Sequence, residues 1–112
     1  MNIGYARVST EDQDLRLQLA ALKDAKCKRV FQEKKSGARA DRPELRRMMD
    51  QLREGDTIVV WRLDRLARST RDLLELCEEI EAAGAGLRSI SEPWADTTSP
   101  AGKMILTVFG GI

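Results

Sequence analysis

The residues of this chain that could do chemistry gather in two short stretches, YARVST at 5–10 and WRLDRLARS at 61–69. The first ends in a serine and a threonine, and the second holds three arginines and one aspartate. A serine hydroxyl among guanidinium groups could attack an anionic phosphate ester, because arginines bind the non-bridging oxygens and neutralise their charge. A serine before a helix is also commonly an N-cap, so the stretch alone leaves both interpretations of Ser9 open.

The arginines would also act on the serine itself. At about 4 Å and an effective dielectric of about 20, one positive charge stabilises an alkoxide by up to about 4 kcal/mol, or roughly 3 pKa units. Two or three arginines could therefore replace a histidine base. If the chain is helical from Asp64 onward, Asp64 and Arg68 share one face, where the carboxylate could orient the guanidinium or pass a proton to a departing oxygen. A surface helix with ordinary salt bridges would show the same spacing.

Several other chemistries are disfavoured by residue types that the chain lacks. It has no histidine, so neither a Ser–His–Asp triad nor a Cys–His pair can be assembled within it. The arginine-rich stretch supplies one aspartate rather than the converging carboxylates of a metal nuclease, and there is no glycine-rich phosphate loop. We therefore expect no metal or nucleotide cofactor. Cys27 and Cys77, which have no second pair to complete a zinc site, are predicted to be reduced thiols.

The formal net charge of +1 is the sum of large local charges of opposite sign. Residues 34–47 carry six positive and two negative side chains, residues 62–71 carry four and one, and residues 75–81 carry four glutamates. The arginine bias of the positive runs suggests a phosphate partner, although a solvated face is the common alternative. With 112 residues and neither a long apolar run nor a leader, the chain is expected to form one domain, 1–112, of a cytoplasmic protein without a membrane partner.

Strand-like and helix-like segments alternate along the chain. The predicted strands are 2–8, 29–33, 57–61 and 86–91. Four helices are predicted. The first follows Thr10 as its cap, and the second begins at Pro43 and ends before Gly55. The third begins near Ser69 and Asp72 and stops at Gly84, and the fourth begins at Ser99–Pro100 and continues through Met104, Ile105 and Val108. This alternation predicts an α/β fold of three layers, with a mainly parallel sheet of four or five strands and helices on both faces.

In such a sheet, ligands bind beyond the carboxyl ends of the strands, near the point where the strand order reverses. Arg7 and Ser9 follow the first predicted strand, and Arg62, Asp64 and Arg65 follow the third. We expect these two groups to meet there.

Five motifs in order, YARVST, Gln18, SGARADRPEL, LDRLARS and GKM, resemble the catalytic domain of the serine recombinases, the resolvases and DNA invertases. The resemblance covers essentially the whole chain. It implies an enzyme in which Ser9 attacks a DNA phosphodiester to give a 5′-phosphoserine and a free 3′-hydroxyl, followed by strand exchange and religation. No metal, nucleotide or small-molecule substrate takes part in the implied reaction.

The resemblance also assigns roles to individual residues. The implied catalytic residues are Arg7, Ser9, Gln18, Arg42, Asp64, Arg65 and Arg68, with Glu33 as a further candidate, and Arg39 and Arg62 are assigned to the DNA backbone. Of these, Arg7, Arg65 and Arg68 would contact the scissile phosphate, while Asp64 and Arg65 are candidates to protonate the leaving oxygen. Because Thr10 is the better cap, Ser9 would be left free to react.

The resemblance implies double-stranded DNA as partner, a homodimer, a synaptic tetramer and a nucleoid-associated location. Family members continue into a long dimerisation helix and a C-terminal DNA-binding domain, so this chain is expected to be a fragment that alone is inactive or weakly active. Two other functions stay open at this stage. The arginines could belong to a non-catalytic nucleic-acid-binding module, or the chain could be a small phosphotransfer or signalling domain of similar architecture.

Overall fold

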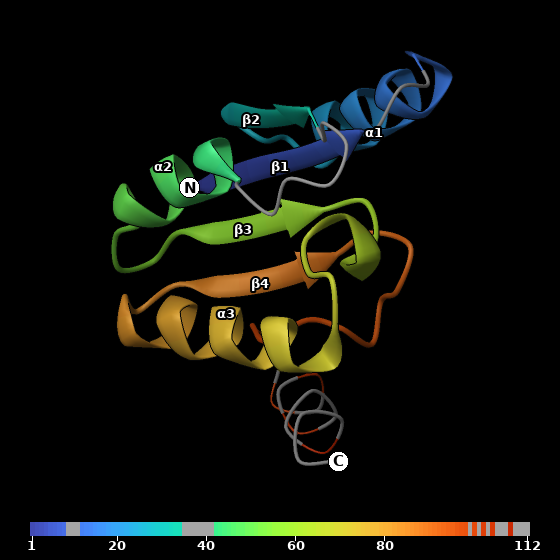
Figure 1. Ribbon diagram of the computed structural model, residues 1–112. Coiled ribbons are helices and arrows are strands. Elements are labelled where there is room, and N and C mark those ends of the chain that lie inside the picture. The colour runs from blue at the N-terminus through green and yellow to red at the C-terminus, as the bar shows by residue number, and fades with distance from the viewer. Residues whose placement is uncertain are drawn as a thin grey trace.

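A computed structural model describes residues 1–8, 12–34 and 42–98, and the single positions 100, 102, 104 and 108. Its strands are β1 (Asn2–Val8), β2 (Arg29–Lys34), β3 (Thr57–Val60) and β4 (Gly86–Ser89). Its helices are α1 (Asp12–Asp24), α2 (Pro43–Asp50) and α3 (Thr70–Ala82), with a short 3₁₀ helix, η1 (Leu63–Arg65). The four strands form one parallel sheet in the order β2-β1-β3-β4 (Figure 1), which confirms the predicted α/β fold.

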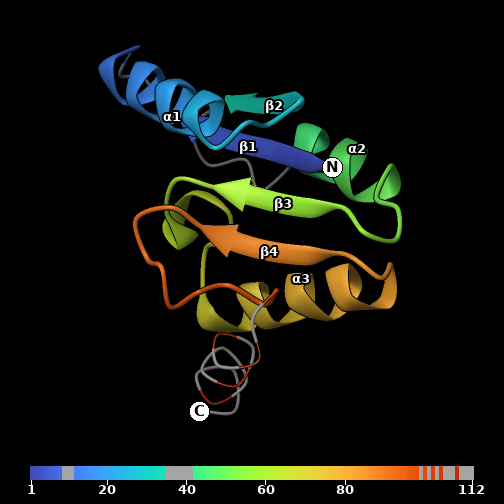
Figure 2. The same ribbon diagram turned by 180° about the vertical axis from the view of Figure 1, so that it is seen from behind.

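The sheet lies between two layers of helices, as predicted. Successive side chains of a strand point to opposite faces, so Ala6 and Val59 pack on one face with Leu22 of α1. On the other face, Ile58 and Val60 join the larger core, to which α2 and α3 contribute. Figures 1 and 2 show α1 behind β1 and β2 in one view and in front of them in the other.

The helix boundaries agree with the sequence at three positions. Pro43 is the first residue of α2. Ser69 is the N-cap of α3, where its hydroxyl oxygen accepts a hydrogen bond from the N–H of Asp72 at 3.1 Å. Gly84 follows the C-cap of α3 with φ of +74°, a conformation that glycine adopts without a steric cost. Local capping signals therefore fixed these helix ends.

The predicted end of α2 was wrong. The helix ends at Asp50, and Gly55 lies five residues further on with φ of +91°. Here the carboxylate of Asp56 accepts the N–H of Arg53 at 3.0 Å, so a side-chain-supported turn leads into β3 in place of another helical turn.

The predicted last helix and the predicted cap Thr10 fall wholly or partly outside the described residues. Positions 100, 102, 104 and 108 are helical, in agreement with the predicted last helix, whereas Thr10, Ser99 and Ile105 lie outside the described residues.

Cys27 and Cys77 are half-buried free thiols, and burial raises the pKa of Cys77 to about 11, with Glu81 adding to the increase. No helix among the described residues is long and apolar enough to cross a membrane.

Candidate active site

The strand order of the sheet reverses between β1 and β3, and Arg7 and Asp64, two of the predicted site residues, meet at this point. β1 pairs with β3 up to Tyr5 opposite Val60 and then runs on to Val8. Arg7 therefore lies beyond the end of β3, and its Nη2 donates a hydrogen bond to the backbone oxygen of Asp64 at 2.5 Å. This contact ties the end of β1, which leads into Ser9, to the turn that carries Asp64 and Arg65. Ser9 itself lies outside the described residues.

Gln18 holds the backbone of Arg7 from the α1 side of the sheet. Its side chain is completely buried. Its Oε1 accepts the N–H of Arg7 at 3.1 Å, and its Nε2 donates to the carbonyl oxygen of Arg7 at 3.0 Å. Because one amide satisfies both backbone groups, Gln18 fixes the course of the chain two residues before Ser9.

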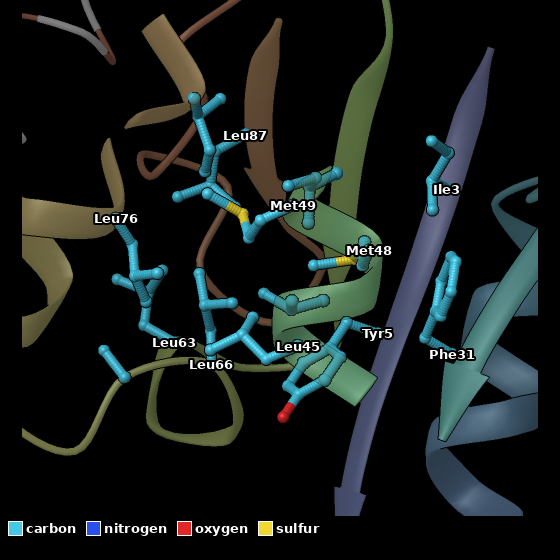
Figure 3. Packing of buried hydrophobic residues seen from close by; sticks show 14 of the residues in the cluster. Ile3, Tyr5, Phe31, Leu45, Met48, Met49, Leu63, Leu66, Leu76 and Leu87 are labelled. Carbon is cyan, nitrogen blue, oxygen red and sulfur yellow. The ribbon is translucent and has the colours of Figure 1, made fainter. Parts of the chain in front are cut away.

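The η1 turn is fixed by burial on one side and a carboxylate on the other. Leu63 and Leu66 are buried in the main core (Figure 3), while the side chain of Asp64 is 58% exposed. The N–H of Leu63 donates to Oε1 of Glu92 at 2.7 Å, and the same oxygen accepts the hydroxyl of Ser89 at 2.9 Å. Burial of the two leucines thus fixes the turn and leaves Asp64 and Arg65, which lie between them in the chain, beyond the end of β3.

The condition under which Asp64 and Arg68 would share one helical face is not met, because no continuous helix joins them. Helical hydrogen bonding in η1 stops after Ala67 bonds to Leu63, and α3 begins only at Thr70. The N–H of Arg68 is taken by the carboxylate of Asp72 at 2.9 Å, which interrupts the helical ladder. Asp64 instead forms an ion pair with Arg62, whose Nη2 lies 3.8 Å from Oδ2 of Asp64.

Arg42 reaches the same region from the N-terminus of α2. It is the N-cap residue of that helix. Its Nη1 donates to the backbone oxygen of Leu66 at 2.6 Å, and its Nη2 donates to both carboxylate oxygens of Asp72 at 3.0 and 2.9 Å. Arg42 thereby connects α2, the segment after η1 and the first turn of α3.

Glu33 supports the helix end that carries Arg42. Its side chain is 5% exposed and accepts hydrogen bonds from the N–H groups of Glu44 and Leu45 at 3.0 and 3.1 Å. The hydroxyl of Tyr5 also donates to it at 3.3 Å. The carboxylate therefore satisfies the first free N–H groups of α2 and matches the positive end of its dipole. In this structure Glu33 acts on the scaffold of the site.

We predict a large loss of stability for Glu33→Ala. The change removes a cap worth about 1 kcal/mol and leaves buried donors unpaired at about 1–3 kcal/mol each, so the free energy of unfolding should fall by about 3 kcal/mol. Urea unfolding measures this. The control Glu78→Ala, at an exposed position of α3, should change it by less than about 0.5 kcal/mol. Equal effects of the two changes would contradict the capping role.

Positive charge is concentrated around Arg7. Burial lowers the pKa of Arg7, the nearby charges of Arg42 and Arg65 lower it further, and Tyr5 and Asp64 oppose the decrease. The guanidinium groups of Arg42, at the N-cap of α2, and of Arg65, in η1, therefore lie within electrostatic reach of Arg7 in β1. Such a cluster favours an anion, because an anion relieves the mutual repulsion of the three cations.

Two further arginines, Arg62 and Arg68, belong to the same stretch of chain as Arg65. Arg62 and Arg65 approach the ring of Trp61, with guanidinium carbons 5.8 and 5.9 Å from its centroid. Arg62 has a half-exposed side chain, and Arg68 is exposed. Of the residues assigned from the sequence, Ser9 and Arg39 lie outside the described residues.

Sequence reasoning missed the contacts of Asp72 and Glu92. The sequence predicts that Asp72 begins or stabilises a helix, and the spacing Ser69-x-x-Asp72 is typical of a helix start. Glu92 gave no local signal, because its partner Leu63 is 29 residues away. Among the described ranges, no group of three or more cysteine, aspartate or glutamate side chains is arranged to hold a metal ion.

Comparison with known proteins agrees with this geometry. The family described as the N-terminal domain of resolvase matches residues 2–112. The chain belongs to this family. It is 46% identical over 112 residues to the serine recombinase gin of Escherichia phage Mu, covering all of this chain and 58% of that protein. It is 45% identical over 112 residues to a DNA-invertase of Escherichia phage P1, covering all of this chain and 60% of that protein.

Solved structures place this resolvase-type domain in the same fold. The crystal structure of the N-terminal catalytic domain of TP901-1 integrase matches with a TM-score of 0.82 and 26% identity, covering 99% of this chain and 92% of that one. The present chain spans about three fifths of the length of the phage Mu and phage P1 relatives.

Proposed function

We propose that this chain is the catalytic domain of a site-specific DNA recombinase, with Ser9 as the nucleophile. The serine hydroxyl gives up its proton as its oxygen bonds to a DNA phosphorus, the bond from phosphorus to the 3′ oxygen breaks, and that oxygen takes up a proton, so the number of protons is unchanged overall. The products are a 5′-phosphoserine and a free 3′-hydroxyl. The observation that supports this best is the gathering of Arg7, Arg42 and Arg65 at the end of the strand that leads into Ser9.

The roles of the side chains follow from charge and position. Arg7, Arg65 and Arg68 bind the non-bridging oxygens of the phosphate and stabilise the charge that builds up in the transition state. Asp64 or Arg65 supplies the proton to the leaving oxygen. Arg42 contributes further positive charge, Arg39 and Arg62 contact the DNA backbone, and Gln18 holds the backbone of Arg7, two positions before Ser9 in the chain.

The partner in this proposal is double-stranded DNA, cut by a synaptic tetramer assembled from homodimers in the cytoplasm, on the nucleoid. The phosphoserine keeps the energy of the broken phosphodiester, so religation needs no external energy source. A dimerisation helix and a DNA-binding domain would follow residue 112, and 1–112 alone would recombine DNA poorly.

Formation of a protein–DNA adduct in the presence of EDTA tests the proposal. The natural protein that contains this chain is incubated with supercoiled plasmids carrying the genomic DNA that flanks its gene. Because arginines supply the positive charge, we expect EDTA to leave cleavage unchanged. The 5′ ends should carry protease-sensitive protein, and the 3′ ends should accept label from terminal transferase. Absence of an adduct, linkage at the 3′ end, or a requirement for Mg²⁺ would each contradict the proposal.

A further inference from the structure

Asp72 makes three kinds of contact at the start of α3. Its carboxylate accepts Nη2 of Arg42 through both oxygens at 2.9 and 3.0 Å, and it accepts the backbone N–H of Arg68 at 2.9 Å. Its own N–H donates to the hydroxyl of Ser69. One carboxylate thus contacts two residues of the proposed site that are 26 positions apart in the chain.

We propose that Asp72 is a positioning residue of the recombination reaction: it holds the Arg42 guanidinium and the backbone of Arg68 in fixed places beside the scissile phosphate. This inference rests on the function proposed above. Asp72 itself stays out of contact with the reacting atoms and acts through the two arginines.

The burial of the pair supports this role. The side chains of Arg42 and Asp72 are only 12% and 16% exposed. Arg42 also donates to the backbone oxygen of Leu66, so its planar guanidinium is held at two points and has little freedom to turn. A charge-assisted pair with fixed geometry keeps a catalytic cation in one place before the substrate arrives.

The charge of Asp72 also lets the arginines lie close together. Arg42 is one of the cations that lower the pKa of Arg7, and the carboxylate of Asp72 partly offsets its charge. Burial opposes ionisation of Asp72, but the hydrogen bond from the Arg68 N–H and the guanidinium of Arg42 lower its pKa overall. Asp72 therefore stays ionised at the neutral pH at which a cytoplasmic enzyme works.

A simpler role for Asp72 is to cap α3. Ser69 provides the matched control, because Ser69→Ala removes a cap of the same helix and leaves the carboxylate that faces Arg42. Asp72→Asn is the informative change. Its amide oxygen can still accept the Arg68 N–H, while the negative charge opposite Arg42 is lost.

The experiment is a double-mutant cycle between Asp72→Asn and Arg42→Ala in the natural protein. The rate of adduct formation is measured at saturating protein, and site binding and urea unfolding are measured in parallel. Asp72→Asn is expected to slow adduct formation about tenfold, with site affinity within about threefold of wild type. In the Arg42→Ala background the same change should alter the rate by less than about twofold, since residues that act through one another are non-additive. Ser69→Ala should stay within about twofold of wild type.

Three results would overturn the inference. They are a wild-type rate in Asp72→Asn, an equal slowing in both backgrounds, and an equal slowing by Ser69→Ala. If wild-type protein forms no adduct, the proposed function fails, and the unfolding cycle still decides whether Asp72 holds Arg42. An interaction of about fivefold or more in the folding equilibrium would support that contact, and additive effects would reject it.

Discussion

Replacing Ser9 with alanine is expected to abolish the covalent protein–DNA adduct while the protein still folds and binds DNA. Alanine has no oxygen with which to attack phosphorus, and the arginines of the proposed site cannot form the covalent intermediate themselves. The loss should exceed about 10⁴-fold in the rate of adduct formation, the scale seen when a nucleophile is removed. Gel electrophoresis in SDS, with and without protease, measures it.

Thr10→Ala is the matched control for this prediction. The sequence predicts that Thr10 caps the helix, so its loss should lower the free energy of unfolding by about 1 kcal/mol and leave the adduct in place. The reverse outcome would contradict our interpretation. If Ser9→Ala destabilised the protein and still formed the adduct, Ser9 would be the cap and another group the nucleophile.

Replacing Arg7 with alanine is expected to slow cleavage by about 10²–10³-fold, the usual effect of removing one donor to a developing negative charge. Site affinity should fall far less, because other arginines still neutralise the phosphate in the ground state. The reason is the position of Arg7: it lies at the end of β1, hydrogen-bonded to the Asp64 backbone and within the field of Arg42 and Arg65. Single-turnover cleavage and a binding titration separate the two effects.

Arg71→Ala supplies the control for Arg7. Arg71 belongs to α3, its side chain is 90% exposed, and it pairs with Glu75 at 3.5 Å. Its loss removes the same formal charge from a position outside the cluster, so cleavage should stay close to wild type. If Arg7→Ala weakened binding and cleavage equally, Arg7 would only neutralise phosphate charge, as in a non-catalytic DNA-binding module.

Three buried or half-buried side chains hold the backbone segments that carry the proposed site. Gln18 holds the end of β1, Glu33 holds the start of α2, and Glu92 holds the start of η1. Each does so by forming hydrogen bonds with backbone groups. The reaction proposed above has no histidine base and relies on closely placed guanidinium groups, so we expect this backbone support to affect its rate.

The sequence predicted the elements well because their signals are local. Alternating apolar residues in 2–8 and the apolar run 57–61 marked two strands that the structure contains within one residue. Pro43, Ser69 and Gly84 marked helix ends through backbone chemistry that depends on near neighbours. The lack of histidine and the surplus of arginine narrowed the possible chemistry before any contact was known.

Only the tertiary structure decided how the site is held together. The pairing of Arg42 with Asp72 spans 30 positions, and that of Leu63 with Glu92 spans 29, so both depend on the order of strands in the sheet. The tertiary structure also decided that the chain from Asp64 to Arg68 is not one continuous helix. Burial of Leu63 and Leu66, together with the capture of the Arg68 N–H by Asp72, outweighed the local helical pattern, because distant packing and hydrogen bonds set the backbone there.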